Sequence, residues 1–202
     1  MAVTGVVLAA GAGTRMGMPK ALVVQHGEPW SARAVRLLLD AGCDRVVVVL
    51  GASATEALAH VPTDDAVSTV INDDWSSGMA SSLRAGLTAV ASADAGLSAD
   101  PGFSANPGLS AAPGDAALIT LVDTPGLPLE AVRRVLASAA PLARAVHDGR
   151  PGHPVLIRSE HWAGIAASVS GDQGARDYLE AHGVADVECG DLWSGSDIDA
   201  PL

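Results

Sequence analysis

A short apolar strand that runs into a glycine-rich turn constrains this chain more than any other feature. Its residues are Val6-Val7-Leu8-Ala9-Ala10-Gly11-Ala12-Gly13-Thr14-Arg15-Met16-Gly17-Met18-Pro19-Lys20. Glycine tolerates left-handed or crowded backbone, so consecutive N–H groups of such a turn can point at phosphate oxygens. Arg15 and Lys20 add positive charge, and Lys20 is the only lysine of the chain. The stretch therefore predicts a site for an anionic ligand.

The turn differs from the two best-known phosphate-binding loops. In a P-loop the lysine follows a glycine directly and precedes Ser or Thr, whereas Met18 follows Gly17 and Ala21 follows Lys20. In the dinucleotide fingerprint the third glycine comes three residues after the second, but Gly17 comes four residues after Gly13, and the second strand ends without a ribose-binding acid. The sequence predicts neither motif.

The first two-thirds of the chain alternates between strand and helix patterns. Buried strands are predicted over Val3–Ala9, Arg45–Leu50, Ala66–Ile71 and Ala116–Val122, and helices over Ser31–Ala41, Thr55–His60, Met79–Val90 and Leu129–Ala139. Ser31 is the expected cap of the first helix, and Gly42 is expected to end it. This alternation predicts an α/β fold, a Rossmann-like three-layer α/β/α sandwich on a mostly parallel mixed sheet.

The remainder of the chain predicts the antiparallel part of that sheet. A strand over Ala143–His147 is expected to turn at Asp148-Gly149-Arg150 and return antiparallel over Pro154–Arg158. Two helices, 160–167 and 173–182, and a short strand, 186–189, are expected to follow. Asp172 is the expected cap of the second helix.

One segment interrupts the core pattern. A six-residue unit containing Pro and Gly occurs three times between residues 97 and 114, as Leu97–Gly102, Phe103–Gly108 and Leu109–Gly114. Such repeats hold too little apolar surface to form a core. We expect one domain over 1–202 with an exposed low-complexity insertion at about 93–115, which is either a neutral loop expansion or a lid or partner-binding segment.

Composition excludes several classes of protein. The formal net charge is -11, and no cluster of basic residues predicts a nucleic-acid partner. Only two cysteines, Cys43 and Cys189, occur, and neither has a neighbour at metal-ligand spacing. The first residues lack the basic region of a signal peptide, and the apolar run is too short to span a membrane. A cytoplasmic protein without a membrane partner is expected.

Four blocks of the chain together resemble the nucleotidyltransferase superfamily, in its MobA-like NTP transferase group. Besides the turn they are Asn72–Leu87, Gly152–Val155 and Gly171–Arg176, in the family's order. The blocks are most similar to the molybdenum cofactor cytidylyltransferase branch. The form Leu-Ala-Ala-Gly at Leu8–Gly11 is commoner in cytidylyl than in guanylyl transferases, which favours CTP.

The resemblance implies a Mg²⁺-dependent transfer of CMP from CTP to the phosphate of a molybdopterin cofactor, with release of pyrophosphate. A molybdoenzyme or its chaperone would then be a partner. In this reaction an oxygen of the acceptor phosphate attacks the α-phosphorus of the nucleotide directly, so no protein nucleophile is required. Both reactants are anions, and catalysis consists of aligning them and neutralising their charge. GTP in place of CTP, or a sugar phosphate or phospho-acid as acceptor, would suit the same turn. A non-catalytic module that delivers a nucleotide or cofactor is the alternative from another class.

Carboxylates at two places are candidates for the Mg²⁺ ligands. Asp123 follows the fourth strand, at the sheet edge where α/β proteins bind ligands, and the family places its metal-binding aspartate in this Asp-x-Pro context. Asp197 and Asp199 alternate, so both would face one side of an extended tail, and Asp199 is the favoured ligand. Asp123 could instead be a turn cap, and the tail carboxylates could be merely solvated. Ala200 stands where the family has threonine, and relatives continue beyond Leu202, which leaves the anchoring of the tail open.

The resemblance also assigns the remaining site residues. Catalytic roles fall to Lys20, Arg15 and Asp123. The acceptor would be contacted by His153, Asp172 and Arg176, with Arg150 as a further phosphate or pterin partner. Alternatively, His153 is a packed histidine before proline and Ser81 serves only its own backbone. Nucleotide contacts are assigned to Leu8, Ala9, Ala10, Gly11, Gly13, Thr14, Arg15, Lys20, Asn72, Gly78, Met79 and Ser81.

Overall fold

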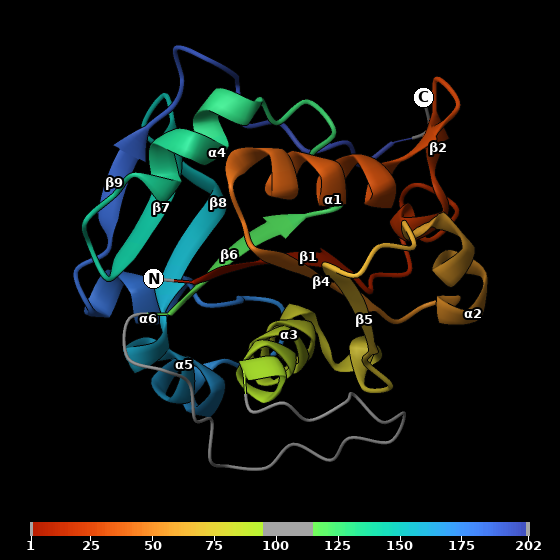
Figure 1. Ribbon diagram of the computed structural model, residues 1–202, viewed down its shortest axis with the longest axis horizontal. Helices are drawn as coiled ribbons and strands as arrows, with labels where there is room; N and C mark the ends of the chain where they lie inside the picture. Colours follow the sequence, from red (N-terminus) through yellow and green to blue (C-terminus); the bar gives the residue numbers. More distant parts are fainter. Residues whose placement is uncertain (1, 95–114, 201–202) are drawn as a thin grey trace.

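The structure, a computed structural model, describes residues 2–94 and 115–200 of the 202-residue chain (Figure 1). The three hexapeptide units at 97–114 lie outside the described residues. The interpretation of that insertion therefore stays a prediction.

Seven strands form one twisted sheet in the order β5-β4-β1-β6-β8-β7-β9. The central strands β4, β1 and β6 pair in parallel, while β8 runs antiparallel to both β6 and β7. This confirms the predicted mostly parallel mixed sheet. The strands span Val3–Ala9 (β1), Arg45–Leu50 (β4), Val67–Ile71 (β5), Ala116–Leu121 (β6), Leu142–His147 (β7), Arg150–Arg158 (β8) and Ala185–Glu188 (β9).

Helices cover both faces of the sheet, as Figure 1 shows. On one face lie α1 (Trp30–Ala41) and α4 (Leu129–Leu136), and on the other lie α3 (Met79–Asp94) and α5 (Trp162–Ser168). The predicted three-layer α/β/α sandwich is thereby confirmed. The smaller elements are a hairpin of β2 (Val24–Gln25) and β3 (Glu28–Pro29), the helices α2 (Ala54–Ala57) and α6 (Arg176–Ala181), and 3-10 turns at Lys20–Leu22 (η1), Leu58–His60 (η2), Trp75–Ser77 (η3) and Ser159–His161 (η4).

The central strands are buried on both faces because their residues alternate between two cores. All seven residues of β1 are buried. Val7 packs with Leu38 in the core beneath α1, and Val6 packs with Leu87 in the core beneath α3. A continuous run of branched apolar residues is what a two-sided environment requires, which is why these strands could be predicted from the sequence.

Two predicted helix caps are wrong. Helix α1 begins at Trp30 after Pro29, and Ser31 lies inside the helix, where its buried Oγ donates a hydrogen bond to the His60 carbonyl at 2.9 Å. Helix α6 begins at Arg176, so Asp172 precedes it by four residues and does not cap it. Gly42 ends α1 in the left-handed conformation, as predicted.

The turn between β7 and β8 also follows the prediction, with Asp148 and Gly149 both at positive φ. Among the helices in the described ranges, none combines the length and apolar character needed to cross a bilayer.

Candidate functional site

Two loops meet at the carboxyl edge of the sheet, where β1 and β6 end side by side. The glycine-rich turn follows β1, and the segment containing Asp123 follows β6. The Val122 N–H donates to the Leu8 carbonyl at 3.1 Å, which keeps the pairing of the two strands going up to the loops. Parallel strands bring their following loops to one edge, and ligands of open α/β sheets bind there.

Glycine at position 13 gives the turn its shape. Gly13 has a φ of 60°, and its carbonyl accepts a hydrogen bond from the Met16 N–H at 2.9 Å. A Cβ at Gly13 would lie 2.0 Å from the Met18 carbonyl oxygen, whereas a Cβ at Gly11 would meet nothing within 4 Å. Gly11, Thr14 and Arg15 face solvent, while Ala9 and Ala10 are buried. The exposed part of the turn is therefore open to an anion.

Charged side chains from three segments meet beside this turn. The Lys20 ammonium donates to Asp123 Oδ2 and to Asp199 Oδ1, each at 2.5 Å, and Arg15 pairs with Asp199. Burial lowers the pKa of Lys20, but the hydrogen bonds to Asp123 and Asp199 outweigh it, so that the pKa is raised. The hydrogen bond from Lys20 lowers the pKa of Asp199. These shifts keep Lys20 protonated and Asp199 ionised at neutral pH.

Three carboxylates in the same cluster match a metal site. Asp123, Asp197 and Asp199 each place one oxygen within 4.8 Å of the others. Asp123 is only 9 % exposed, and its buried Oδ1 has no hydrogen-bond partner among the described residues. A buried carboxylate oxygen without a donor is costly unless a cation meets it, and hard divalent cations prefer such oxygens. The cluster fits a divalent metal ion, with both tail carboxylates and not Asp199 alone in reach.

A second group of predicted nucleotide contacts makes hydrogen bonds within the protein. The buried Asn72 side-chain amide donates to Ser81 Oγ at 2.8 Å and to Ser82 Oγ at 3.1 Å. Ser81 Oγ also lies 2.9 Å from the carbonyls of Asp74 and Gly78. These contacts shape the entry to α3, which agrees with the alternative that Ser81 serves its own backbone.

Gly78 joins that entry to the later half of the chain. A Cβ on Gly78 would lie 2.5 Å from the carbonyl carbon of Gly171, and the Ala80 N–H donates to the Gly171 carbonyl at 2.9 Å. Asp172 is exposed and adjoins Gly78. The close approach that glycine permits here is therefore to the chain itself.

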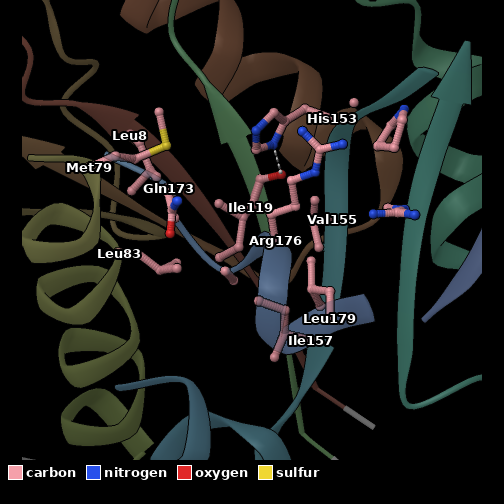
Figure 2. A pocket seen from close by; sticks show the side chains of 15 residues that line it. Leu8, Met79, Leu83, Ile119, His153, Val155, Ile157, Gln173, Arg176 and Leu179 are labelled. Carbon is pink, nitrogen blue, oxygen red and sulfur yellow. Dashed lines mark hydrogen bonds between the residues drawn. The ribbon is translucent and has the colours of Figure 1, made fainter. Parts of the chain in front are cut away.

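A cavity of about 180 Å³ adjoins the end of β1. Figure 2 shows side chains of α3 on one side and of β8 and α6 on the other. Most of its surface is apolar, and its polar side chains are His153, Gln173, Arg144 and Arg176. The lining residues are Leu8, Met79, Leu83, Ile119, Arg144, Pro151, Gly152, His153, Val155, Ile157, Gln173, Gly174, Ala175, Arg176 and Leu179.

The polar groups of the cavity differ in charge. Burial lowers the pKa of His153, so its imidazole is uncharged at neutral pH, with Nδ1 3.3 Å from the Ile119 carbonyl (Figure 2). A neutral ring that donates from Nδ1 offers Nε2 as an acceptor. Arg144 is buried, and its Nε donates to Asp186 at 2.7 Å, while exposed Arg176 pairs with Glu180. Arg144 also lies 3.5 Å from Glu180, so the cavity carries two guanidinium groups, each paired with a carboxylate, beside apolar surface.

Ala9, Ala10, Gly11, Gly13 and Thr14 lie in the glycine-rich turn and at its start, and the structure divides the other predicted site residues among three places. Arg15, Lys20, Asp123 and Asp199 meet in the charged cluster, and Leu8, Met79, His153 and Arg176 line the cavity. Asn72, Gly78, Ser81 and Asp172 lie around the start of α3, and Arg150 is exposed and is not among the lining residues.

Sequence reasoning missed the buried Arg144 and the contact between His147 and Trp193, which joins β7 to the C-terminal tail. Arg144 could have been found, because an arginine inside an otherwise apolar strand signals a buried charge with partners. His147 and Trp193 carry no such signal, since their contact joins residues that are 46 positions apart.

Comparisons with known proteins cover nearly the whole chain. Residues 5–187 match the model of the MobA-like NTP transferase domain. Nicotine blue oxidoreductase of Paenarthrobacter nicotinovorans is 36 % identical over 98 % of this chain and 92 % of its own.

Two solved structures with the same fold come from mycobacteria. The Rv0371c homologue of Mycobacterium sp. strain JC1 is 28 % identical with a TM-score of 0.75, covering 98 % of this chain and 90 % of its own. Rv0371c of Mycobacterium tuberculosis H37Rv, in a complex with manganese, is 22 % identical with a TM-score of 0.65, covering 100 % and 92 %. The family model and the 36 % identical relative both extend over nearly the whole chain, and the protein therefore belongs to the MobA-like NTP transferase family.

Proposed function

We propose that this protein is a metal-dependent nucleotidyltransferase that moves CMP from CTP to the phosphate of a molybdopterin-type acceptor and releases pyrophosphate. The observation that carries the proposal is the contact of Lys20 with Asp123 and Asp199 directly beside the glycine-rich turn. It combines fixed cations for phosphate with carboxylates for a metal. Membership of the MobA-like family supports the transfer chemistry.

Asp123, Asp197 and Asp199 would hold the metal ion, which we propose to be Mg²⁺. Bound there, the metal would neutralise charge on the triphosphate and orient its oxygens. The unpartnered Oδ1 of Asp123 supports a cation at this place. The manganese in the Rv0371c complex supports a divalent ion in a relative of the same fold.

The residues around the metal would place the nucleotide. The N–H groups of the turn from Gly11 to Arg15 would bind the phosphates, and Lys20 and Arg15 would neutralise the charge that develops as pyrophosphate leaves. The form Leu-Ala-Ala-Gly at Leu8–Gly11 supports CTP over GTP. We also propose that residues 72–81 contact the base of the nucleotide. The hydrogen bonds that Asn72 and Ser81 make would hold this segment in place for that contact.

The cavity would hold the acceptor. Its volume, about 180 Å³, and its apolar lining suit a flat ring system better than a sugar, whose hydroxyls would lose hydrogen bonds to water there. The neutral His153 Nε2 could accept a hydrogen bond from a ring N–H. Arg144 and Arg176 would favour an anionic group on the acceptor. A sugar phosphate or a phospho-acid is the alternative acceptor.

A second candidate function is redox chemistry on an aromatic substrate. The 36 % identical relative is called nicotine blue oxidoreductase, and the apolar cavity next to a nucleotide-type turn would also suit a planar dye beside a reduced nicotinamide nucleotide. In that reaction the nucleotide would lose a hydride to the dye, and no pyrophosphate would be released.

Two assays with the same enzyme preparation separate these functions. Pyrophosphate release is measured with Mg²⁺ and molybdopterin-type cofactor, with CTP, GTP, ATP or UTP offered in turn, and oxidation of NADH or NADPH is measured with nicotine blue. Asp123→Ala is the control in both assays. We expect release that is selective for CTP and lost in the variant.

Each other outcome contradicts a stated part of the proposal. Pyrophosphate release with GTP would mean that GTP, and not CTP, is the nucleotide substrate. Pyrophosphate release with a sugar phosphate would mean that the acceptor is a sugar phosphate and not a molybdopterin-type cofactor. Nucleotide oxidation that survives in Asp123→Ala, without any pyrophosphate release, would replace the transferase proposal by the redox function. Nucleotide binding without turnover in either assay would support a delivery module.

A further inference from the structure

We propose that His147 is a positioning residue, which holds the C-terminal tail so that Asp197 and Asp199 face Asp123. The inference rests on the metal site of the proposed function and adds a residue that none of the sequence patterns indicated. His147 ends β7, is 2 % exposed and is not one of the three carboxylates of the cluster.

The tail needs such a contact because it has no regular secondary structure. After β9 ends at Glu188, residues 189–200 form neither strand nor helix. Its first hydrogen bond to the sheet joins the Cys189 N–H to the Val146 carbonyl at 2.7 Å, and the Trp193 N–H then folds back to the Cys189 carbonyl at 3.2 Å. A segment with few backbone hydrogen bonds opens easily unless side chains secure it.

His147 lies between the tail and β8. Its Nδ1 is 3.1 Å from the Trp193 carbonyl, and its Nε2 is 3.3 Å from the His153 carbonyl. The imidazole also meets the Trp193 ring edge-on, with centroids 5.2 Å apart and planes at 80°. The two ring nitrogens point in different directions, so one side chain contacts both the strand and the tail. A neutral ring donates to only one of the two carbonyls, and the tautomer decides which one.

Glycines on both sides show that the chain is shaped around this ring. A Cβ on Gly152 of β8 would lie 2.8 Å from His147 Cδ2, and a Cβ on Gly195 of the tail would lie 2.5 Å from the same atom. Any other residue at either position would push the imidazole or the tail aside. The fit is therefore close in both strand and tail.

The same part of the tail contacts the loop of Asp123. Trp193 packs on Gly126, where a Cβ would come within 2.9 Å of the indole Nε1, and the Ile198 N–H donates to the Asp123 carbonyl at 2.9 Å. His147 and Gly126 thus fix the tail on either side of Trp193. Asp197 and Asp199 follow within six residues of that point.

Electrostatics explains why the tail must be held. Three carboxylates within 4.8 Å repel one another, and only Asp123 is on a loop that the sheet fixes directly. Lys20 and Arg15 offset part of this repulsion at Asp199, but Asp197 has no such ion pair among the described residues. Without the contact at His147, the tail would depend on those ion pairs and on the Ile198 hydrogen bond alone, and a metal ion would have to supply part of the free energy needed to order it. A held tail therefore raises metal affinity by pre-organisation.

The test is titration of the full-length protein with Mn²⁺ alone, followed by calorimetry, without nucleotide or acceptor. His147→Phe keeps an aromatic ring and removes both ring nitrogens, and with them the N–H that can donate to the Trp193 or the His153 carbonyl. We expect its Kd for Mn²⁺ to rise about 10- to 100-fold, the range found for residues that orient metal ligands. The Mn²⁺ concentration that half-saturates turnover should rise by the same factor, while kcat at saturating Mn²⁺ stays near that of the wild type.

Two further variants separate an effect of the His147 contact from poor folding and from a general effect of changing the tail. Gly195→Ala disturbs the same contact from the tail side, at a position outside the core, and should weaken Mn²⁺ binding even if His147→Phe folds poorly. Asp191→Asn is the matched control, since it removes an exposed tail contact to Arg134 and should leave the Kd within about twofold. Melting curves check that each variant is folded.

The outcomes separate this inference from the proposed function. Mn²⁺ binding by the wild type that Asp123→Ala abolishes, with unchanged affinity in folded His147→Phe and Gly195→Ala, overturns the role of His147 and leaves the metal site standing. An equal loss of Mn²⁺ affinity in Asp191→Asn also overturns the role of His147, because loss of any tail contact would then weaken metal binding to the same extent. No Mn²⁺ binding by the wild type overturns both.

Discussion

The carboxylates of the site come from two regions that are held in different ways. Asp123 lies two residues beyond β6, a strand that pairs with β1 on one side and β8 on the other. Asp197 and Asp199 lie on an irregular tail held by His147, Trp193 and the hydrogen bond from Ile198. One region is placed by backbone pairing and the other by side-chain packing, so we expect them to respond differently to substitution.

The largest difference is expected in metal binding by the carboxylates themselves. Asp123→Asn should weaken Mn²⁺ binding about 1000-fold, which is more than the 10- to 100-fold change expected for a residue that only orients metal ligands. The reason is that Asp123 is nearly buried and the substitution removes the negative charge from its unpartnered Oδ1. Asp197→Asn should weaken it about tenfold, since Asp197 is exposed. Calorimetric titration checks both, and equal losses would contradict the ranking of the two regions.

The next difference concerns glycines with positive φ in each region. Gly13→Ala should lower the free energy of unfolding by about 2 to 3 kcal/mol, because the new Cβ meets the backbone carbonyl of Met18 and the φ of 60° is strained for alanine. Gly195→Ala should cost less than about 1 kcal/mol, since only the tail has to move. Urea unfolding measures both effects.

Gly11→Ala is the matched control for the turn, because nothing lies within 4 Å of a Cβ there. Its free energy of unfolding should stay within about 0.5 kcal/mol of the wild type. Two results would contradict the distinction between a turn shaped by backbone geometry and a tail held by packing. One is a large drop in the free energy of unfolding of Gly11→Ala. The other is a drop in Gly195→Ala as large as that in Gly13→Ala.

The smallest difference is a pH effect at the two cysteines. Desolvation raises the pKa of Cys43, which precedes β4, from 9.0 to about 12. The folded-state pKa exceeds the unfolded one, so the stabilisation is complete below pH 9 and is lost as pH rises from 9 toward 12. At pH 10 the loss is about 1.4 kcal/mol.

Chemical unfolding of Cys43→Ala at pH 8 and pH 10 tests this effect. The variant should lose about 1.4 kcal/mol less than the wild type between the two pH values. At Cys189, where the tail begins, desolvation raises the pKa and Arg134 opposes it, so Cys189→Ala should change the pH dependence less. A larger change at Cys189 than at Cys43 would reverse the comparison.

Prediction from sequence succeeded where local patterns decide the structure. The strand over Val3–Ala9 was placed with its observed bounds, and Arg45–Leu50 likewise, because runs of apolar residues identify strands buried on both faces. It failed at two helix caps, although the predicted starts at Met79 and Leu129 are the observed ones. Ser31 and Asp172 are good capping residues in general, but the burial of Ser31 against His60 and the packing of the 171–174 turn on Gly78 decided otherwise.

The site shows the same division. The sequence placed Lys20, Arg15 and Asp123 near the carboxyl edge of the sheet, and the structure brings them together with Asp199. The cavity combines side chains from β1, α3, β6, β7, β8 and α6, and its lining residues Leu83, Ile119, Val155 and Leu179 look like ordinary core residues in the sequence. No local pattern distinguishes a residue that lines a cavity from one that fills a core.

The amino-acid sequence by itself determined the α/β architecture, the glycine-rich turn and the presence of carboxylates suited to a metal, because periodicity, glycine and charge act over a few residues. Only the tertiary structure decided that Asp197 and Asp199 both reach Asp123, and that His147 and Trp193 hold them there. Those contacts join residues dozens of positions apart, and the energy of such contacts depends on distances that exist only once the sheet has formed.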